Sequence, residues 1–380
     1  MQSPDDPAVS VVALGAGTDL SAFMNVPRRV YATDPNWIPP LKFMEKQRFS
    51  PSNHFFDHAR WQGWVAFRDG QPVGRITAQI DEQHLDRYAD AAGYFGMLEG
   101  EDDPAIFRAL FEAAEHWLRE QVMAQVRGRF YLHVNEEVGL LVEGFDSPPF
   151  ILMGHGRPWY GQQVLDGGYT PVKDVLAYKV RPDFEAPRVM TKLAERVSDQ
   201  VTVRCLRRRQ LLDDAEVMRD IFNDAWANNW NFVPWDREDF AETVKTMAML
   251  MPDDYIQIAE YQGRPVAFIV ALPNLNEAIR DLDGRLFPFG WAKLLWRLKV
   301  GHPSTARVPL MGVRQAFQHS RLGPTLAFLV IDAVRKALHA RGVVDVEMGW
   351  ILEDNDGMRN IIETIGGIAY KRYRFYEKAL

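Results

Sequence analysis

The sequence predicts an α/β protein in which one structural unit occurs twice. Two separate motifs support this fold class, because Asn36-Trp37 recurs as Asn229-Trp230 and Gly70-Gln71-Pro72-Val73 recurs as Gly263-Arg264-Pro265-Val266, each 193 positions later. In both halves a segment with helical character precedes the Asn-Trp pair, and the Gly-x-Pro-Val motif separates two runs typical of strands. One separation shared by two independent motifs indicates a tandem repeat.

The composition is that of a globular protein. Of the 380 residues, 47% are hydrophobic and 25% are charged, and the formal net charge is -7. This length suggests two or three domains with enough chain to bury a sizeable core. The acidic balance argues against wholesale binding of nucleic acid, so we expect no nucleic-acid partner.

Cysteine usage and the first residues favour a cytoplasmic protein. Met1–Ala8 is acidic and contains proline, unlike a signal peptide, and no apolar run reaches the ~20 residues that cross a bilayer. Cys205 is the single cysteine, which excludes an internal disulfide and fits a reducing compartment. Within the strand-like run Val201–Leu206 we expect a buried, inert thiol. Peripheral contact with the inner face of the cytoplasmic membrane is a further expectation.

The first half, residues 1–182, contains the elements of one α/β unit. The runs that flank its Gly-x-Pro-Val motif, Trp61–Phe67 and Val73–Ile80, predict a hairpin. Asp103 is a candidate N-cap for a helix over 104–121, where apolar side chains recur at helical spacing. The other strand candidates are Gly93–Leu98, Phe130–Val134 and Tyr169–Val180.

The strand-to-helix junction of the first half is acidic. Its sequence is Glu99-Gly100-Glu101-Asp102-Asp103. Carboxylates at this point repel a phosphate from the helix N-terminus that would otherwise attract it. We therefore expect the first half to be a structural partner that contributes to the acceptor site.

A linker and a second unit follow. Residues 183–200, with a charged helical stretch over 189–197, form the expected linker, and residues 201–380 form the second half. One addition to this half is the aromatic run Trp226–Trp235, which is either a cover for the acceptor site or a core-packing loop. The larger addition is the insertion Asn274–Thr305.

The insertion contains a short amphipathic helix. Its apolar face consists of Trp291, Leu294, Leu295 and Leu298. Its basic face consists of Lys293 and Arg297, followed by Lys299. This pattern is typical of an interfacial membrane segment or of a lid over an apolar substrate, and an ordinary helix packed on the other half is the third interpretation. The candidate substrate-binding residues are this apolar face, Trp230 and Phe289.

The stretch around residues 308–325 predicts an anion-binding turn. Val308–Val313 has the apolar character of a strand, and apolar residues recur at helical spacing over Leu326–His339. Pro324 falls in the first helical turn, where a missing N–H costs nothing. Such a junction presents unpaired N–H groups and a positive dipole end, so the expected ligand is a phosphate or pyrophosphate. The chargeable side chains around it are Arg314, His319 and Arg321.

The segment Gln318-His319-Ser320-Arg321-Leu322-Gly323 resembles the pyrophosphate loop of the GNAT superfamily, Gln/Arg-x-x-Gly-x-Gly/Ala, with Arg321 in place of the first glycine. The strand Val343–Leu352, then Asn355, a short helix and a closing strand Tyr370–Lys378 follow in the GNAT order. The resemblance covers both halves. It implies that each is a mixed, mostly antiparallel sheet flanked by helices, with acyl-CoA as cosubstrate and no permanently bound cofactor.

The resemblance also implies a set of CoA-binding residues at the end of the fourth strand and in the loop. They are Met311, Gly312, Val313, Gln318, His319, Ser320, Arg321, Leu322, Gly323, Pro324 and Thr325. The tyrosine that often serves as general acid in this superfamily is replaced by Ile362. No metal is expected, because His54 and His58 have ligand spacing without a second ligand pair.

An amine must be neutral to attack a thioester, so a nearby base helps the reaction. The candidate catalytic residues are Glu347 within the fifth strand, Glu353 or Asp354 at its end, and Asn355, the position of the GNAT asparagine. The next candidates belong to a polar cluster in the first half, which comprises His133, Asn135, Glu136, Glu137 and His155.

These observations favour an acyl-CoA-dependent N-acyltransferase. A large apolar insertion would strengthen the binding of a long acyl chain or a lipid-like amine, because each buried CH₂ contributes ~0.8 kcal/mol of binding free energy. A tandem GNAT protein with the insertion Phe287-Pro288-Phe289-Gly290-Trp291 is similar to the bacterial ceramide synthases, which implies a sphingoid base as amine acceptor. A small-molecule N-acetyltransferase using acetyl-CoA and a non-catalytic acyl-CoA-binding protein remain open as alternatives.

Overall fold

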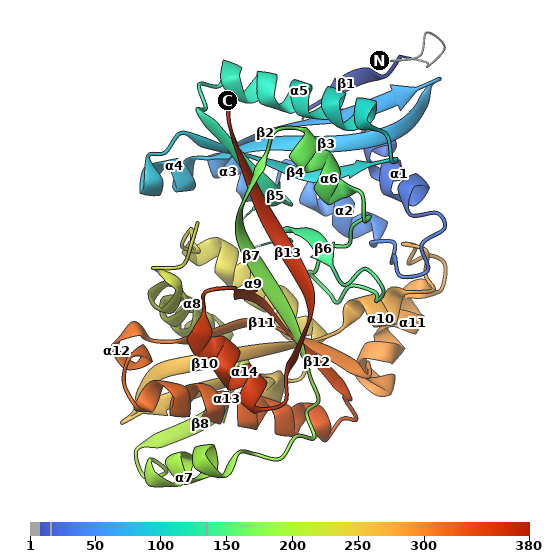
Figure 1. Cartoon of the computed structure of the whole chain (residues 1–380). Helices are drawn as coiled ribbons and strands as arrows, with labels where there is room; N and C mark the ends of the chain where they lie inside the picture. The colour runs from blue at the N-terminus through green and yellow to red at the C-terminus, as the bar shows by residue number, and fades with distance from the viewer. Residues whose placement is uncertain (1–7, 16, 134–135) are drawn as a thin grey trace. The chain divides into compact units, whose positions relative to one another are not determined.

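The computed structural model describes residues 8–15, 17–133 and 136–380, and the chain forms two compact units. Unit 1 comprises the chain up to Val175 together with Asp283–Arg285 and Lys371–Leu380. Unit 2 comprises Leu176–Leu282 and Leu286–Tyr370. Strands β7 (Thr170–Val180) and β13 (Ile368–Ala379), which are green and red in Figure 1, each contribute residues to both units.

The sheet of unit 1 has the strand order β1-β2-β3-β4-β5. Its strands are β1 (Ser10–Leu14), β2 (Ala59–Arg68), β3 (Gln71–Asp81), β4 (Ala92–Gly100) and β5 (Gln125–Phe130). The first three pairings are antiparallel and the β4–β5 pairing is parallel. The end of β13 pairs antiparallel with β5, and β13 also pairs with β6 (Leu140–Glu143).

Helix α5 (Pro104–Glu120) covers this sheet, as Figure 1 shows. It begins where predicted, because the Asp103 carboxylate accepts a hydrogen bond from the Ala105 N–H and Pro104 takes the first helical position. Its apolar residues at helical spacing, among them Ile106, Leu110 and Leu118, are fully buried. The other helices of unit 1 are α1 (Ser21–Val30), α2 (Lys42–Arg48), α3 (Phe55–His58), α4 (Glu82–Tyr88) and α6 (Tyr160–Asp166).

The sheet of unit 2 repeats the same pattern with the order β8-β9-β10-β11-β12. Its strands are β8 (Val201–Cys205), β9 (Ile256–Tyr261), β10 (Arg264–Pro273), β11 (Thr305–Val313) and β12 (Asp345–Leu352). Three pairings are antiparallel and the β11–β12 pairing is parallel. The expected mixed, mostly antiparallel sheet is therefore confirmed in both units.

The main helices of unit 2 are α8 (Leu211–Trp226) and α13 (Leu322–His339), which both contact the strands of its sheet. The remaining helices are α7 (Arg188–Arg196), α9 (Arg237–Leu250), α10 (Leu275–Ile279), α11 (Gly290–Trp296), α12 (Gln315–Gln318) and α14 (Asp356–Thr364). Short helical turns lie at Arg208–Gln210, Asp253–Tyr255 and, in π geometry, Arg297–Gly301. Helix α7 occupies the charged part of the predicted linker.

The repeated Gly-x-Pro-Val motif forms the same turn in both units. Strands β2 and β3 pair up to Arg68↔Gln71, and strands β9 and β10 pair up to Tyr261↔Arg264. Each turn has two residues with positive φ, and the second is glycine: Gly70 at +73° and Gly263 at +75°. Two such residues define the hairpin turn whose twist matches the flanking strands. The tandem repeat is therefore visible in the backbone.

Two element boundaries differ from the sequence prediction. The strand predicted at Phe130–Val134 is wrong, because β5 ends at Phe130; Val134 itself lies outside the described residues. The arginines in β5 are unusual for a buried strand, so the sequence pattern did not indicate a strand there. Arg127 pairs with Asp90 and Glu377, and these ion pairs offset the free-energy cost of its partial burial. Helix α13 begins at Leu322 rather than Leu326, so Pro324 still lies in its first turn.

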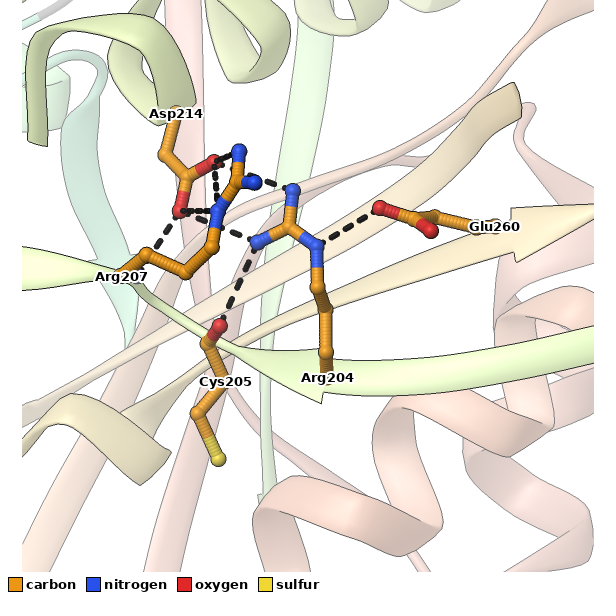
Figure 2. A network of polar contacts seen from close by, with 5 residues as sticks. All are labelled: Arg204, Cys205, Arg207, Asp214 and Glu260. Atoms are coloured by element: carbon orange, nitrogen blue, oxygen red, sulfur yellow. Dashed lines mark hydrogen bonds and ion pairs between the residues drawn. The ribbon is translucent and has the colours of Figure 1, made fainter. Parts of the chain in front are cut away.

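The expectation of a buried Cys205 is also wrong. This residue is exposed, because it ends the edge strand β8. Figure 2 shows the polar network beside it: Arg204 and Arg207 both bind the buried carboxylate of Asp214, and Arg204 also binds Glu260. Burial alone would raise the pKa of Asp214, but hydrogen bonds from Arg207 and Arg204 hold it below its ordinary value. The network ties the end of β8 to the start of α8.

Candidate active site

The parallel strands of unit 2 separate part-way along their length. Strand β11 pairs with β12 from Thr305↔Asp345 to Val308↔Met348. Beyond this point β11 continues along β10 to Val313, while β12 continues to Leu352. The two strand ends therefore diverge and leave a gap between them.

A β-bulge in β11 lies where the divergence begins. Between the pairs Val270↔Leu310 and Leu272↔Arg307, β11 advances by three residues while β10 advances by two. The extra residue falls at Val308–Pro309, and Pro309 has no N–H to donate. A bulge bends its strand and ends regular pairing, and bulges are frequent beside active sites.

A cleft of about 580 Å³ occupies this gap. Its walls are residues 308–313 of β11 and residues 348–352 of β12, and the starts of α13 and α14 line it as well. The lining includes Trp226, Asn228 and Asn229, and also Pro309, Trp350 and Met358, which the sequence prediction did not single out. Trp226, Asn228 and Asn229 lie within the aromatic run that was flagged as a cover for the acceptor site, and Trp230 from the same run also lines the cleft.

Backbone groups of β11 point into the cleft. The Met311 carbonyl accepts a hydrogen bond from Trp226 Nε1 (2.9 Å), and the Val313 carbonyl accepts one from Gln318 Nε2 (2.8 Å). Both carbonyls therefore point away from β10. The N–H and C=O of one residue lie on the same side of an extended strand, so the N–H groups of Met311 and Val313 share this direction. They are suitable donors for a carbonyl oxygen lying along β11.

The loop after β11 is more closed than the sequence suggested. Helix α12 forms one turn within it, and the Ser320 N–H donates to the Phe317 carbonyl (2.9 Å). The Leu322 N–H donates to Ser320 Oγ (3.1 Å) and the Gly323 N–H to the Ser320 carbonyl (3.3 Å). These three N–H groups are bonded within the loop, in contrast to the unpaired donors expected from the sequence.

Gly323 is required by a close approach between α12 and α13. A Cβ at this position would lie 2.5 Å from the Phe317 carbonyl oxygen and 3.1 Å from Gln318 Cα. Arg321, which stands where the GNAT pattern has its first glycine, has a φ of -64°. Any residue adopts that conformation, so the loss of the first glycine does not strain this loop.

The candidate CoA-binding residues divide into two groups. Those that line the cleft are Met311, Gly312, Val313, Gln318, His319, Gly323 and Pro324. Within the part of the chain that the structure describes, Ser320, Arg321, Leu322 and Thr325 are not among the lining residues. Of the chargeable side chains, Arg314 binds Asp220 (2.6 Å) and the Pro265 carbonyl (3.0 Å), whereas His319 and Arg321 are exposed.

Glu347 lies in a buried ion pair. Its side chain is fully buried with that of Arg307 (3.4 Å), and the Tyr370 hydroxyl donates to it. Arg307 also donates to the Gly349 carbonyl (3.1 Å) and stacks on the ring of Trp350, 4.5 Å from its centroid. Among the residues described, Glu347 does not belong to the lining of the cleft, so its contacts indicate that it holds the wall strand β12 in place.

The end of β12 brings two other polar residues to the cleft. Asn355 lines it, but its Oδ1 accepts a hydrogen bond from the Met358 N–H (3.1 Å) and so caps α14. Asp354 also lines the cleft. Glu353 is half-buried outside the lining set, and its carbonyl accepts a hydrogen bond from Arg359 (2.7 Å). Ile362, at the position of the usual tyrosine, is fully buried, as expected of a core side chain.

The insertion residues lie elsewhere. Leu298 is buried, whereas Phe289, Trp291 and Leu295 are 78%, 48% and 51% exposed. In the described parts of the chain, none of the insertion's apolar side chains lines the cleft between β11 and β12. The geometry of unit 2 therefore does not show a lid over this cleft.

Comparison with solved structures shows a shared fold. A tandem GNAT protein from the clavulanic acid biosynthesis pathway has a TM-score of 0.55 at 14% identity, over 98% of each chain. A GCN5-related glucosamine N-acetyltransferase region of a fungal multi-domain GH3 β-N-acetylglucosaminidase has a TM-score of 0.58 at 14% identity. It matches all of this chain, which spans 39% of that larger one.

Two curated relatives are far closer in sequence. Protein YghO of Escherichia coli (strain K12) is 50% identical over 363 residues, 95% of this chain and 93% of that protein. A protein named bacterial ceramide synthase, from Caulobacter vibrioides (strain NA1000 / CB15N), is 43% identical over 378 residues, 98% of both. The chain belongs to the family that contains these two relatives, and its fold is that of the tandem GNAT proteins. No family model matches it.

In the first GNAT unit the corresponding parallel strands are β4 and β5, which pair from Ala92↔Gln125 to Gly96↔Phe130. Side chains form hydrogen bonds with the backbone groups at the end of β4. The Trp159 Nε1 donates to the Gly100 carbonyl (3.2 Å), and the Gly100 N–H donates to the Tyr160 hydroxyl (3.2 Å). Neither group of Gly100 is left for a ligand.

The neighbouring Glu99 is buried among donors. The hydroxyls of Tyr31 and Tyr160 each donate to its carboxylate at 2.6 Å, and Arg129 lies 3.5 Å away. Burial first, and then the charge of Glu99, raise the pKa of both tyrosines well above its ordinary value, so both hydroxyls remain protonated donors. Side chains thus occupy this end of β4 in the first GNAT unit.

The polar cluster of the first GNAT unit is an ion-pair network. Asp81 contacts His58 (3.0 Å) and His133 (3.8 Å), and His155 contacts Asp34 (3.0 Å). Burial raises the pKa of Glu136 and Glu137 above its ordinary value, against the charge of Arg48. Asn135 lies outside the described residues. Within the residues described, no group of three or more His, Cys, Asp or Glu side chains is placed to hold a metal ion.

Proposed function

We propose that unit 2 transfers a long-chain acyl group from acyl-CoA to the amine of a sphingoid-type lipid, the reaction of a ceramide synthase. The observation that carries this proposal is the 43% identity, over 98% of both chains, to the protein named bacterial ceramide synthase. The open cleft between β11 and β12 supports the same reaction class, because it combines inward N–H groups with a helix N-terminus.

The proposed position of CoA follows from the polarity of the cleft. The pyrophosphate would lie by the start of α13, where His319 and Arg321 are exposed and the helix dipole favours an anion. The pantetheine arm would run along β11, where the N–H groups of Met311 and Val313 face the cleft. Pro309, two residues further back, has no N–H, so Met311 is the innermost of these donors. Its N–H is proposed to polarise the thioester carbonyl.

The reaction is an acyl transfer from sulfur to nitrogen. The neutral amine attacks the thioester carbon, the carbonyl oxygen takes up negative charge, and the Met311 N–H stabilises that charge. As the C–N bond forms and the C–S bond breaks, the amine loses a proton and CoA leaves as a thiol. The products are an amide and free CoA.

A base is needed because an alkyl amine has a pKa of ~10.4 and is almost entirely protonated at neutral pH. Asp354 is the carboxylate of the β12 end that lines the cleft, next to Asn355. We propose that it accepts the amine proton, with Glu353 as the second candidate. Glu347 is less suited to this role, because Arg307 and Tyr370 already engage its carboxylate away from the cleft.

The acyl chain and the lipid acceptor would use the apolar part of the lining. Trp226, Trp230, Met358 and Ile361 contribute apolar surface to the cleft. Each methylene removed from water contributes ~0.8 kcal/mol, so a long chain gains affinity that an acetyl group does not.

The test is a matrix of donors and acceptors. Purified protein is supplied with acetyl-, octanoyl- or palmitoyl-CoA and with either sphinganine or a short soluble amine, while released CoA thiol and amide product are measured. We expect the highest kcat/KM for palmitoyl-CoA with sphinganine. Preference for acetyl-CoA with the soluble amine would replace the proposal with a small-molecule acetyltransferase. Binding of acyl-CoA without thiol release in any combination would indicate a non-catalytic acyl-CoA-binding protein.

A further inference from the structure

Large apolar side chains are exposed in one short part of the insertion. In the described residues, 17 large hydrophobic side chains are exposed, and six of them lie within the 14 residues 287–300. These six are Phe287 (82%), Phe289 (78%), Trp291 (48%), Leu295 (51%), Trp296 (61%) and Val300 (64%). Single exposed apolar residues are ordinary on a protein surface, but such a concentration marks an interaction site. We call residues 287–300 the aromatic segment.

The helix within the aromatic segment exposes two of its large apolar side chains, while its two charged residues bind a carboxylate of the protein. Lys293 and Arg297 turn toward the carboxylate of Asp281, which both bind, and Arg297 also donates to the Ala278 carbonyl (2.6 Å). Trp291 and Leu295, one turn apart on the opposite side of α11, face solvent. A surface helix of a water-soluble protein normally buries its apolar face and exposes its charges. Here Lys293 and Arg297 bind the Asp281 carboxylate, whereas Trp291 and Leu295 point outward and Leu298 is buried.

The exposed tip of the segment is held in shape by its own contacts. The Trp291 N–H donates to the Leu286 carbonyl (2.8 Å), and the Trp291 indole donates to the Pro288 carbonyl (3.1 Å). Leu298 is 4% exposed and anchors the end of the segment. Phe287 and Phe289 therefore project from a turn that hydrogen bonds hold in shape.

The charge of the surroundings fits an anionic surface. The insertion Asn274–Thr305 carries five Lys and Arg residues against three Asp and Glu residues, in a chain whose net charge is -7. Lys299 lies within the aromatic segment and donates to the Met249 carbonyl (2.7 Å), a neutral partner. Met249 itself is 64% exposed and extends the apolar surface.

We infer that the aromatic segment docks unit 2 onto an anionic lipid bilayer. Phe287 and Phe289 enter the boundary between headgroups and acyl chains, the indoles of Trp291 and Trp296 lie at headgroup level, and Lys299 contacts lipid phosphates. None of the helices that the structure describes has the length and apolar character to cross a membrane. The contact is therefore an interfacial one. It does not depend on the proposed reaction, although it would give an acyltransferase access to an amine resident in the bilayer.

Vesicle co-sedimentation tests this inference on the full chain without acyl-CoA or amine, so the outcome is separate from any activity. The wild-type protein is mixed with vesicles of phosphatidylethanolamine and phosphatidylglycerol or of phosphatidylcholine alone. The double variant Phe287→Ser/Phe289→Ser should partition onto the anionic vesicles at least ten-fold more weakly than the wild type. Both side chains are about four-fifths exposed, so their loss should leave the melting temperature unchanged.

The matched control is Val122→Ser/Val189→Ser, which removes apolar side chains that are 82% and 70% exposed outside the insertion. It should bind vesicles like the wild type. Lys299→Gln should lose affinity for the anionic vesicles, with little change on phosphatidylcholine. Equal vesicle binding by the Phe287→Ser/Phe289→Ser variant and the wild type would overturn the inference. So would a wild-type dimer, detected by sedimentation velocity, that this variant abolishes, since a second copy of the chain would then be the occupant.

Discussion

In unit 1 the end of β4 is enclosed by side chains, whereas in unit 2 the matching end of β11 opens onto a cleft. Both strands run parallel to a partner for four or five residues; β5 then ends at Phe130, whereas β12 continues away from β11 to Leu352. In unit 1, Trp159 and Tyr160 bond the backbone of Gly100. In unit 2, the carbonyls of Met311 and Val313 are bonded from the side of the cleft, and the N–H groups face it. The same topology is thus enclosed by side chains in one unit and open to a cleft in the other.

The junctions that follow these strands differ in charge. In unit 1, Glu101 binds Arg29, and Asp103 binds Arg68 while capping α5. In unit 2, the junction carries His319 and Arg321, both exposed. An acidic cap stabilises a helix N-terminus by itself, but it leaves no place for an anionic ligand. The two junctions therefore differ mainly in the charge that their side chains place at the helix N-terminus.

The largest effect is expected at the proposed base of unit 2. Asp354→Asn should lower turnover ~10²–10⁴-fold, with partial recovery as the pH rises, because the amine then deprotonates without help. Asp356→Asn, two residues further along the cleft wall, is the matched control and should retain most activity. A steady-state pH–rate profile of both variants makes the measurement. Near-normal turnover of Asp354→Asn at neutral pH would move the base to Glu353, which Glu353→Gln examines directly.

The next effect concerns the enclosed end of β4. Glu99→Gln in unit 1 should lower the free energy of unfolding by ~3 kcal/mol, since it weakens two tyrosine hydrogen bonds and leaves Arg129 with less negative charge beside it. Acyl-CoA affinity should not change. Urea denaturation and calorimetric titration give the two readouts, with the exposed Glu82→Gln as control. A loss of acyl-CoA affinity in a folded Glu99→Gln protein would contradict the assignment of unit 1 as scaffold.

Placing a negative charge at the strand-to-helix junction of unit 2, as in unit 1, should produce a smaller effect, on the affinity for acyl-CoA. Arg321→Glu places a carboxylate at the start of α13, so acyl-CoA should bind ten-fold or more weakly. Arg237→Glu makes the same charge change at a side chain that is 78% exposed on another helix of unit 2, and it should leave affinity within two-fold. Titration of acyl-CoA into each variant at one fixed ionic strength decides the matter. An unchanged dissociation constant for Arg321→Glu would remove the loop from the proposed CoA site.

The smallest effect is expected at Asp214, where a substitution should change the stability of unit 2. The pKa of Asp214 is lowered in the folded protein, so its ionised form adds stability above the ordinary pKa of 3.8 and loses that contribution as the pH falls through the lowered value. Asp214→Asn should therefore cost ~1–3 kcal/mol at pH 7, and its deficit relative to the wild type should shrink below about pH 4. Denaturation curves at several pH values test this, with the exposed Asp213→Asn as control. A deficit that stays constant down to pH 2 would contradict the role of the ion pairs.

Periodicity and repeated motifs predicted the fold because they depend on local physics. The two hairpin turns, helix α5 with its Asp103 cap and the order of strands in the second half all follow from spacing, capping and turn chemistry. Strand β5 was misplaced because Arg127 is tolerated only through partners that are far away in the sequence, Asp90 and Glu377. Sequence spacing does not reveal such long-range compensation.

The candidate site was predictable in part. The stretch from Met311 to Pro324 follows a motif, and seven of its predicted residues line the cleft. Trp350 was not predicted, because its place in the cleft wall depends on how β12 continues beyond its last pair with β11. Glu347 had the right chemistry for a base, but its burial with Arg307 depends on the direction in which one strand residue points. Because side chains alternate between the two faces of a strand, a shift of one residue moves a side chain from the cleft to the core.

The sharing of β13 between the units has a consequence for synthesis of the chain. Strand β5 is complete at Phe130, but the residues that pair with its far edge, Tyr376–Ala379, are made much later. At ~5–20 residues per second, a ribosome needs roughly 10–50 seconds to add the ~240 residues between them. Throughout that interval the nascent first repeat presents an unpaired strand edge, the kind of surface on which neighbouring chains associate. A stop codon ahead of Tyr376 would therefore damage the half of the protein that was translated first.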